Sequence, residues 1–133
     1  MMMHKPSLLK GRERLAIARL NSTDEIPKMV KDSPFWSITI TREEISMVLE
    51  EHYVLPNWKV DFGWRYLKVI GPLDFSLTGI LSSILVPLAK AGISIFVIST
   101  YDTDYILVKD YLFEKAISVL NYDGYEIKNE FSD

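Results

Sequence analysis

Two carboxylates stand close together in the segment ISIFVISTYDTDYILV, residues 93–108. Asp102 and Asp104 lie in or beside a tight turn between two runs of strand-forming residues. Two carboxylates that face one centre can act as general acid and base, as in glycosidases and aspartic proteases. Asp is also common in turns, because its side chain accepts hydrogen bonds from nearby backbone N–H groups. Among the catalytic, turn-forming and ligand-binding interpretations, we expect Asp102 to form the turn and Asp104 to contact a ligand.

A second group of chemically useful residues lies in GPLDFSLTGI, residues 71–80, where a predicted strand leads into a predicted helix. The first N–H groups of a helix lack partners within the helix, and the helix dipole favours a negative group there. Ser76 and Thr78 add hydroxyl groups, and Gly79 allows a ligand to approach closely. The segment lacks the Gly-Lys-Ser/Thr ending of a P-loop. The alternative interpretation is an ordinary helix capped by Asp74 or Ser76.

These two segments are complementary to the two charged groups of an amino acid. In a ferredoxin-like unit, the loop before the first helix and the turn after the following strand lie at one end of the sheet. The helix start offers N–H donors to a carboxylate, and Asp104 offers an acceptor to an ammonium or guanidinium group. Neither His4 nor His52 has a motif that pairs it with a serine or threonine, so no activated nucleophile is visible.

Composition argues against several other classes of function. The formal net charge is −3 and no basic run is present, so we expect no binding to nucleic acid. The chain has no cysteine, which excludes disulfides, thiolate catalysis and cysteine-ligated metal. No calcium loop or spaced histidine pair is present, and no apolar run approaches the length of a membrane span. We therefore expect a cytoplasmic protein that is not an enzyme, holds no metal or cofactor, and does not associate with membranes.

The second half of the chain predicts the order strand, helix, strand, strand, helix, strand. The strands are predicted at residues 64–71, 93–100, 105–108 and 125–131. The clearer helix carries Leu77, Ile80, Leu81, Ile84, Leu85 and Leu88 at helical spacing, and the other carries Phe113, Ala116, Ile117 and Leu120. Asp110 is a candidate cap for the second helix. This order is typical of a split βαβ, ferredoxin-like unit with both helices on one face.

The first half predicts a thinner version of the same order. Strands are expected at residues 13–20, 35–40 and 45–51, with a short helix after Asn21–Asp24 and a short strand or connector at 58–61. The predicted fold is α+β, with two ferredoxin-like βαββαβ units in tandem and antiparallel sheets that carry helices on one face. We expect residues 1–12 to be a flexible N-terminus, 13–62 a first, degenerate unit, and 63–133 a second unit.

The segment FSLTGILSSILVPLAKAGISIFVISTYDTDYILV resembles the core of an ACT domain. It is similar to the small tandem-ACT proteins of bacteria and archaea, and to the ACT modules of the animal cytosolic arginine sensor of the TORC1 pathway. FWSITITREEISMVLEE resembles the first ACT unit of that sensor. The resemblance covers about residues 14–120 and implies that both predicted units are ACT units.

The resemblance also implies which residues meet a ligand. ACT domains bind amino acids, usually where two ACT units meet. The ligand's backbone atoms would meet Ser76, Leu77, Thr78 and Gly79, together with Ser94 and Ile95 of a neighbouring unit. Asp104 stands where the sensor has a ligand-binding carboxylate, and Thr100 and Thr103 line the same turn. The sensor has four ACT units and this chain has two, which implies a homodimer. Leu77 replaces an acidic residue of the sensor, so arginine is not identified as the ligand.

The predicted function is that of a non-catalytic, amino-acid-binding regulatory protein or sensor. The alternative is a structural dimerisation or partner-binding module without a small ligand. Exposed strand edges or Trp36, Trp58 and Trp64 would serve that alternative, although core packing is another interpretation of these tryptophans.

Overall fold

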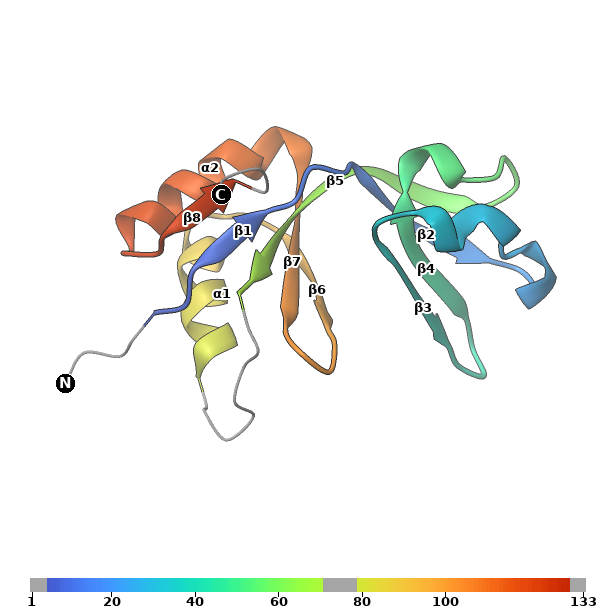
Figure 1. The fold of residues 1–133 in the computed structure, drawn as a ribbon, viewed down its shortest axis with the longest axis horizontal. Helices are drawn as coiled ribbons and strands as arrows, with labels where there is room; N and C mark the ends of the chain where they lie inside the picture. Colours follow the sequence, from blue (N-terminus) through green and yellow to red (C-terminus); the bar gives the residue numbers. More distant parts are fainter. Residues whose placement is uncertain (1–4, 71–78, 130–133) are drawn as a thin grey trace. The chain divides into compact units, whose positions relative to one another are not determined.

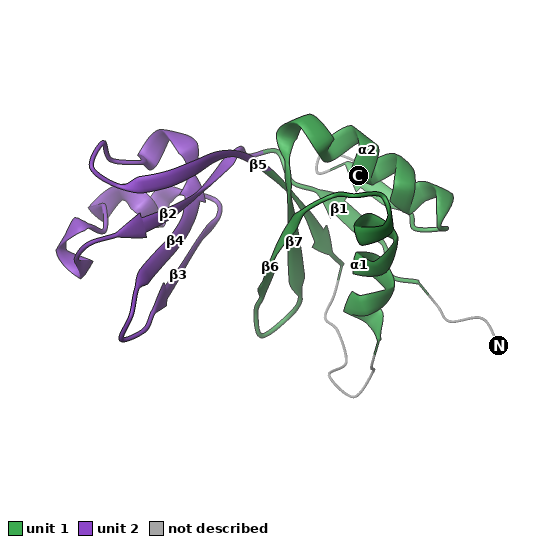
Figure 2. Ribbon diagram, turned by 180° about the vertical axis from the view of Figure 1, so that it is seen from behind, with its two compact units in different colours: residues 1–12, 65–133 green, residues 13–64 purple. Residues whose placement is uncertain are grey.

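The computed structural model describes residues 5–70 and 79–129. In this part the chain has eight strands, two α-helices and three 3-10 helices, a mixed α/β structure. It divides into two compact units, unit 1 (Met1–Arg12 and Arg65–Asp133) and unit 2 (Glu13–Trp64), which Figure 2 colours separately. Unit 2 is thus inserted in the sequence of unit 1. Neither α-helix in the described part is long and apolar enough to cross a membrane.

Unit 1 contains both α-helices (Figure 1). Its elements are β1 (Leu8–Lys10), the second part of β5 (Lys59–Val69), α1 (Ile80–Lys90), β6 (Ile95–Ser99), β7 (Asp104–Lys109), α2 (Asp110–Tyr122) and β8 (Ile127–Asn129). From β5 onward the predicted order of strands and helices is confirmed. The last strand is shorter than predicted within the described residues. Asp110 is the first residue of α2 rather than its cap, a position that Lys109 occupies.

The N-terminal strand β1 changes the predicted sheet of unit 1. β1 pairs antiparallel with β5 and parallel with β8, while β7 pairs with β5 and with β6. The strand order is therefore β8-β1-β5-β7-β6, a mixed sheet of five strands, and the prediction of an antiparallel sheet is wrong for the pair β1 and β8. The prediction of a flexible segment over residues 1–12 is also wrong for Leu8–Lys10. Leu8 is fully buried, and its N–H donates to the Glu126 carbonyl at 2.8 Å, which anchors β1 in the sheet.

The core of unit 1 lies between its sheet and the two helices. Alternate residues of β5 and β7, namely Leu67, Val69, Ile106 and Val108, belong to one buried cluster with Ile84 and Leu88 of α1 and Phe113, Ala116, Ile117 and Leu120 of α2. Because alternate residues of a strand point to the same face, both helices cover the same face of the sheet. This agrees with the predicted placement of the helices.

Unit 2 is a four-stranded antiparallel sheet covered by short 3-10 turns. Its elements are β2 (Leu15–Leu20), η1 (Thr23–Glu25), η2 (Lys28–Asp32), β3 (Trp36–Ile40), β4 (Ile45–Glu50), η3 (Glu51–Tyr53) and the first part of β5, with the order β3-β4-β2-β5. The predicted short helix is replaced by η1 and η2. Pro27 stands between them and has no backbone N–H to donate, so one helix does not run through both.

β5 is one strand of eleven residues, where a short strand and a separate longer strand were predicted. Its pairing with β2 passes from Leu15↔Trp64 to Ile17↔Asp61, so β5 has one extra residue at this point, a β-bulge. Gly63 lies in the bulge with φ of +81°, a backbone conformation that favours glycine. The structure divides the units after Trp64, two residues beyond the predicted division.

Candidate functional site

The carboxylate of Asp104 lies at the start of β7, on the face of the sheet that the helices cover. Asp104 shares this face with Ile106 and Val108, which are two and four residues further along β7 and belong to the core beneath the helices. Its register partner across the hairpin is Ser99, whose hydroxyl donates to Asp104 Oδ1. Ser99 was not predicted as a site residue, because the predicted strands end at Thr100 and resume at Tyr105, one residue later than β6 ends and β7 begins.

The turn between β6 and β7 is fixed at both of its ends. The Thr100 N–H donates to the Thr103 carbonyl at 2.8 Å, and the Thr103 N–H donates to the Thr100 hydroxyl at 3.3 Å. Thr103 is buried, and its own hydroxyl donates to the carbonyl of Val69 at the end of β5. Thr100 and Asp102 are exposed. Of the predicted turn residues, Thr103 is therefore occupied in holding the turn against β5, and Thr100 faces solvent.

The beginning of α1 lies at the same end of unit 1 as this turn. In both ribbon views the end of β5, the first turn of α1 and the β6–β7 turn lie together at one end of the unit (Figures 1 and 2). Gly79 is the N-cap of α1, with φ of +82°, and provides no side-chain cap. It is exposed, and a β-carbon placed on it would have no atom within 4 Å. The predicted site residues Ser76, Leu77 and Thr78, and the candidate cap Asp74, lie outside the described residues.

Ser94 and Ile95 lie far from Asp104 within one copy of the chain. Ser94 is exposed just before β6, and Ile95, the first residue of β6, pairs with Val108. Five residues of extended strand separate Ser94 from Ser99, a distance of about 16 Å. β6 pairs with β7 alone among the described strands, so it is an edge strand. The structure therefore brings Gly79, Thr100, Thr103 and Asp104 to one end of unit 1 and leaves Ser94 and Ile95 at the other end of β6.

A shallow groove of about 460 Å³ runs along the outer side of α1 and was not predicted. Its lining residues are Gly79, Ser82, Ser83, Val86, Pro87 and Lys90 of α1, together with Asp123 after α2. Lys5 Nζ lies 3.6 Å from Asp123 Oδ2. The one sequence signal for the groove is the spacing of three or four residues between small or polar positions of α1. The groove begins at Gly79 and so adjoins the predicted site.

Unit 2 has a turn with the same hydrogen bonds as the β6–β7 turn, but it lacks a polar pair like Ser99 and Asp104 beside that turn. The Thr41 N–H donates to the Glu44 carbonyl at 2.9 Å, and the Glu44 N–H donates to the Thr41 hydroxyl at 3.2 Å, as in the turn at residues 100–103. The residues that flank this turn in register are Ile40 and Ile45. The positions of Ser99 and Asp104 are therefore apolar in unit 2.

The described residues contain no group of three or more His, Asp or Glu side chains arranged to hold a metal ion. The carboxylates at the β6–β7 turn are those of Asp102 and Asp104, and Asp104 is the one that is half-buried. The arrangement offers one carboxylate acceptor next to a helix beginning. A carboxylate is an acceptor for a cationic group, and the N–H groups of a helix start are donors to an anionic one.

Comparison with known proteins identifies the part of the chain that carries these features. Residues 59–122 match the family model of the ACT domain, and residues 13–57 match a second family model that describes an N-terminal domain. A protein of Agobacterium tumefaciens with a crystal structure is 35% identical, with a TM-score of 0.88, and the match covers 98% of this chain and 97% of that one.

Two further proteins show similarity of different kinds. The human protein CASTOR3P is 37% identical over 87 residues, which are 56% of this chain and 53% of the human protein, so the chain spans about half the length of this relative. The regulatory subunit of aspartate kinase from Thermus thermophilus has a TM-score of 0.64 at 7% identity, and the match covers 91% of this chain and 99% of that one. This last likeness is one of fold. Through residues 59–122, which hold α1, the β6–β7 turn and Asp104, the chain belongs to the ACT domain family.

Proposed function

We propose that this protein is a non-catalytic, amino-acid-binding regulatory protein of the cytoplasm. In this proposal the chain has two ferredoxin-like ACT units in tandem, with unit 2 the degenerate one, and acts as a homodimer. A ligand is held where ACT units of two copies meet. The observation that carries the proposal is that Asp104 lies on the helix-covered face of unit 1, at the end where α1 begins.

The two charges of a free amino acid match this arrangement. The hydroxyl of Ser99 engages Oδ1 of Asp104, and among the residues that the structure describes no group is bonded to Oδ2. Oδ2 accepts a hydrogen bond from the α-ammonium group, while the N–H groups at the start of α1 bind the α-carboxylate. The exposed Gly79 leaves room for the ligand beside the helix start.

The comparison of the two units supports one ligand per chain. At the positions of Ser99 and Asp104, unit 2 has Ile40 and Ile45, which cannot bind an ammonium group. Unit 2 also has short 3-10 turns where unit 1 has the eleven-residue helix α1. We therefore assign the ligand to unit 1 alone.

The position of Ser94 and Ile95 supports the proposed homodimer. Their distance from Asp104 along β6 means that one copy does not bring them to its own ligand. β6 has one edge unpaired among the described strands, and a second copy can approach that edge. In the proposal the second copy supplies its Ser94 and Ile95 to the ligand.

A thermal-shift screen with the twenty amino acids tests the proposed function. A ligand at about 100 times its Kd adds about 2.7 kcal/mol to the free energy of unfolding and raises Tm by several degrees. We expect at least one amino acid to do this with the wild-type protein and with the control Asp102→Asn, and none to do it with Asp104→Asn. A wild-type Tm that is unchanged by all twenty amino acids, or an equal shift in Asp104→Asn, would contradict the proposal.

One observation favours the alternative of a dimerisation or partner-binding module without a small ligand. β3 is the edge strand of unit 2, and its Trp36 and Ile40 side chains are 42% and 58% exposed, whereas Trp58 and Trp64 are buried. Exposed apolar residues on an edge strand favour association with another chain. Light scattering with and without amino acids separates the two functions. A dimer whose mass and stability respond to none of the twenty would favour the alternative.

A further inference from the structure

Two peptide connections join unit 1 to unit 2. The chain leaves unit 1 after Arg12 and returns to it at Arg65. On the unit 1 side, Gly11 and Arg65 flank these connections. On the unit 2 side, Arg14 and Gly63 flank them. In each unit, one charged side chain links the two flanking segments to each other.

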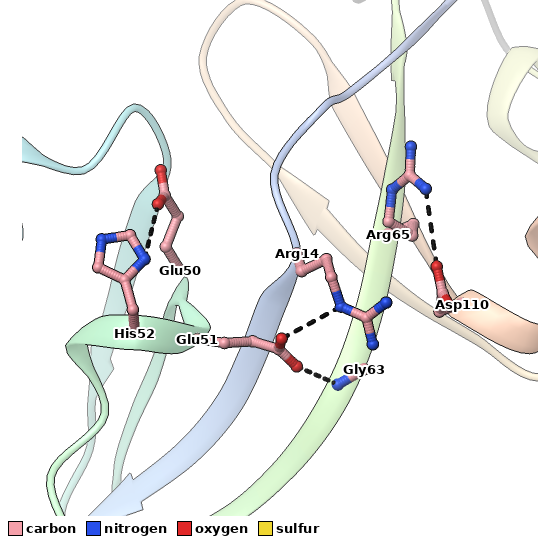
Figure 3. A network of polar contacts seen from close by, with 7 residues as sticks. All are labelled: Arg14, Glu50, Glu51, His52, Gly63, Arg65 and Asp110. Carbon is pink, nitrogen blue, oxygen red and sulfur yellow. Dashed lines mark hydrogen bonds and ion pairs between the residues drawn. The ribbon is translucent and has the colours of Figure 1, made fainter.

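In unit 1 this side chain is Arg65. Its Nη2 donates to the carbonyl of Gly11 at 3.1 Å, and its Nη1 lies 3.6 Å from Asp110 Oδ1 at the start of α2 (Figure 3). The guanidinium carbon lies 4.4 Å from the ring centroid of Phe113. The planar guanidinium group of Arg65 therefore links Gly11, where the chain leaves unit 1, to Arg65 itself, where the chain returns, and to α2. A lysine ammonium group cannot make these contacts in the same geometry.

Gly11 also contacts Tyr66, the residue that follows Arg65. Its N–H donates to the carbonyl of Tyr66 at 2.9 Å. A β-carbon on Gly11 would lie 2.0 Å from the Tyr66 ring, so the ring rests directly on the glycine backbone. Gly11 is thus fixed against the chain that returns to unit 1 by the Tyr66 carbonyl, the Tyr66 ring and the Arg65 side chain.

In unit 2 the corresponding side chain is Glu51. Its Oε1 accepts from Arg14 Nε at 3.2 Å, and its Oε2 accepts from the Gly63 N–H at 2.7 Å (Figure 3). The Glu51 N–H also donates to the Arg14 carbonyl at 3.0 Å. The β-bulge takes Gly63 out of the pairing with β2, and Glu51 provides the acceptor for its N–H.

We propose that Arg65 and Glu51 act as paired clamps: each side chain holds the two connections together within its own unit. The clamps make the two units unfold in one cooperative transition. With the Arg65 clamp closed, a unit 2 that unfolds alone remains a loop pinned at both ends, and it gains less conformational entropy than a free chain. With the Glu51 clamp closed, the ends of unit 1 are likewise held by unit 2. Such coupling transmits stabilisation of either unit to the other, and it does not depend on the identity of any ligand.

Two spectroscopic probes report on the two units separately. All three tryptophans of the chain, Trp36, Trp58 and Trp64, belong to unit 2, so tryptophan fluorescence follows unit 2. Both α-helices of the described chain belong to unit 1, so circular dichroism at the helical band follows unit 1. Urea unfolding followed by both probes on one sample therefore measures the coupling.

The test uses conservative variants with a matched control. We expect the two unfolding curves to coincide in the wild-type protein and in Glu50→Gln, because the Glu50 carboxylate lies 3.2 Å from His52 Nδ1, whereas the neighbouring Glu51 carboxylate bonds to Arg14 and Gly63. In Glu51→Gln and in Arg65→Lys the fluorescence and dichroism midpoints separate by about 1 M urea, because the coupling between the units is lost. Separate transitions in the wild-type protein, or coincident ones in both variants, would overturn the proposal.

Hydrogen exchange of the wild-type protein keeps the test decisive if a variant fails to fold. Under coupling, the slowest amides of β4 in unit 2 and of β7 in unit 1 open with the same free energy and the same urea dependence. Different opening free energies for the two strands would refute the coupling without any variant.

Discussion

Replacing Thr103 with valine removes the hydroxyl that holds the β6–β7 turn against the end of β5. Valine keeps the branched shape of threonine, so the packing around this 3% exposed side chain is retained. The Val69 carbonyl loses this donor in a buried place, which costs about 1–3 kcal/mol. For a chain of this length, we expect the Tm to fall by about 4–12 °C.

Differential scanning calorimetry without any ligand measures this change. Thr100→Val is the matched control, because the Thr100 hydroxyl donates to the Thr103 carbonyl at 3.1 Å in the same turn but its side chain is exposed. An exposed hydrogen bond contributes less, so we expect Thr100→Val to lower Tm by under about 4 °C. The reasoning is refuted if Thr103→Val melts with the wild-type protein, or if Thr100→Val loses as much stability as Thr103→Val.

Three further predictions concern the glycines at the connections and the partner of Asp104. Gly11→Ala forces a methyl group into the Tyr66 ring and should lower the free energy of unfolding by about 1–3 kcal/mol in urea; an unchanged midpoint would mean that the ring does not rest on Gly11. Gly63→Ala should cost about 1–2 kcal/mol because of the φ of +81°, and Gly63→Asn should cost less, since asparagine tolerates this conformation; equal costs would count against the bulge. Ser99→Ala should weaken by about fivefold the binding of any amino acid that raises the Tm, measured by calorimetric titration, because it frees the carboxylate that Ser99 orients; unchanged affinity would remove Ser99 from the site.

Long periodic patterns predicted the helices and the β6–β7 hairpin of unit 1. The spacing of the leucines and isoleucines of α1 places Ile84 and Leu88 in the core, as expected. The apolar run before the turn at residues 100–103 forms β6, and the residues after it form β7. These elements are long enough for their pattern to outweigh local ambiguity.

Short or interrupted elements were not predictable in the same way. β1 has three residues, too few to show alternation, and its pairing with β5 and β8 comes from the tertiary structure. Pro27 divides a segment whose apolar spacing suggested one short helix. The units were predicted to divide between residues 62 and 63, whereas the structure has a bulge at Gly63 within the continuous strand β5. Glycine and proline mark a local irregularity, but the sheet decides whether the strand continues.

At the candidate site, too, local sequence predicted some features and the pairing of distant strands decided the others. Turn chemistry predicted that Asp102 and Asp104 differ, and the structure leaves Asp102 exposed and pairs Asp104 with Ser99. The sequence does not reveal that Thr103 donates to Val69, because the two residues are brought together by the pairing of β7 with β5. Residue type identifies candidates, and strand register decides which of them are available to a ligand.

Calorimetric titration of the wild-type protein with the amino acid that most raises its Tm tests the central claim most directly. The account predicts saturable binding with one ligand per chain, retained in Asp102→Asn and abolished in Asp104→Asn. Two ligands per chain, or undiminished binding by Asp104→Asn, would contradict the assignment of the ligand to the end of unit 1 where α1 begins.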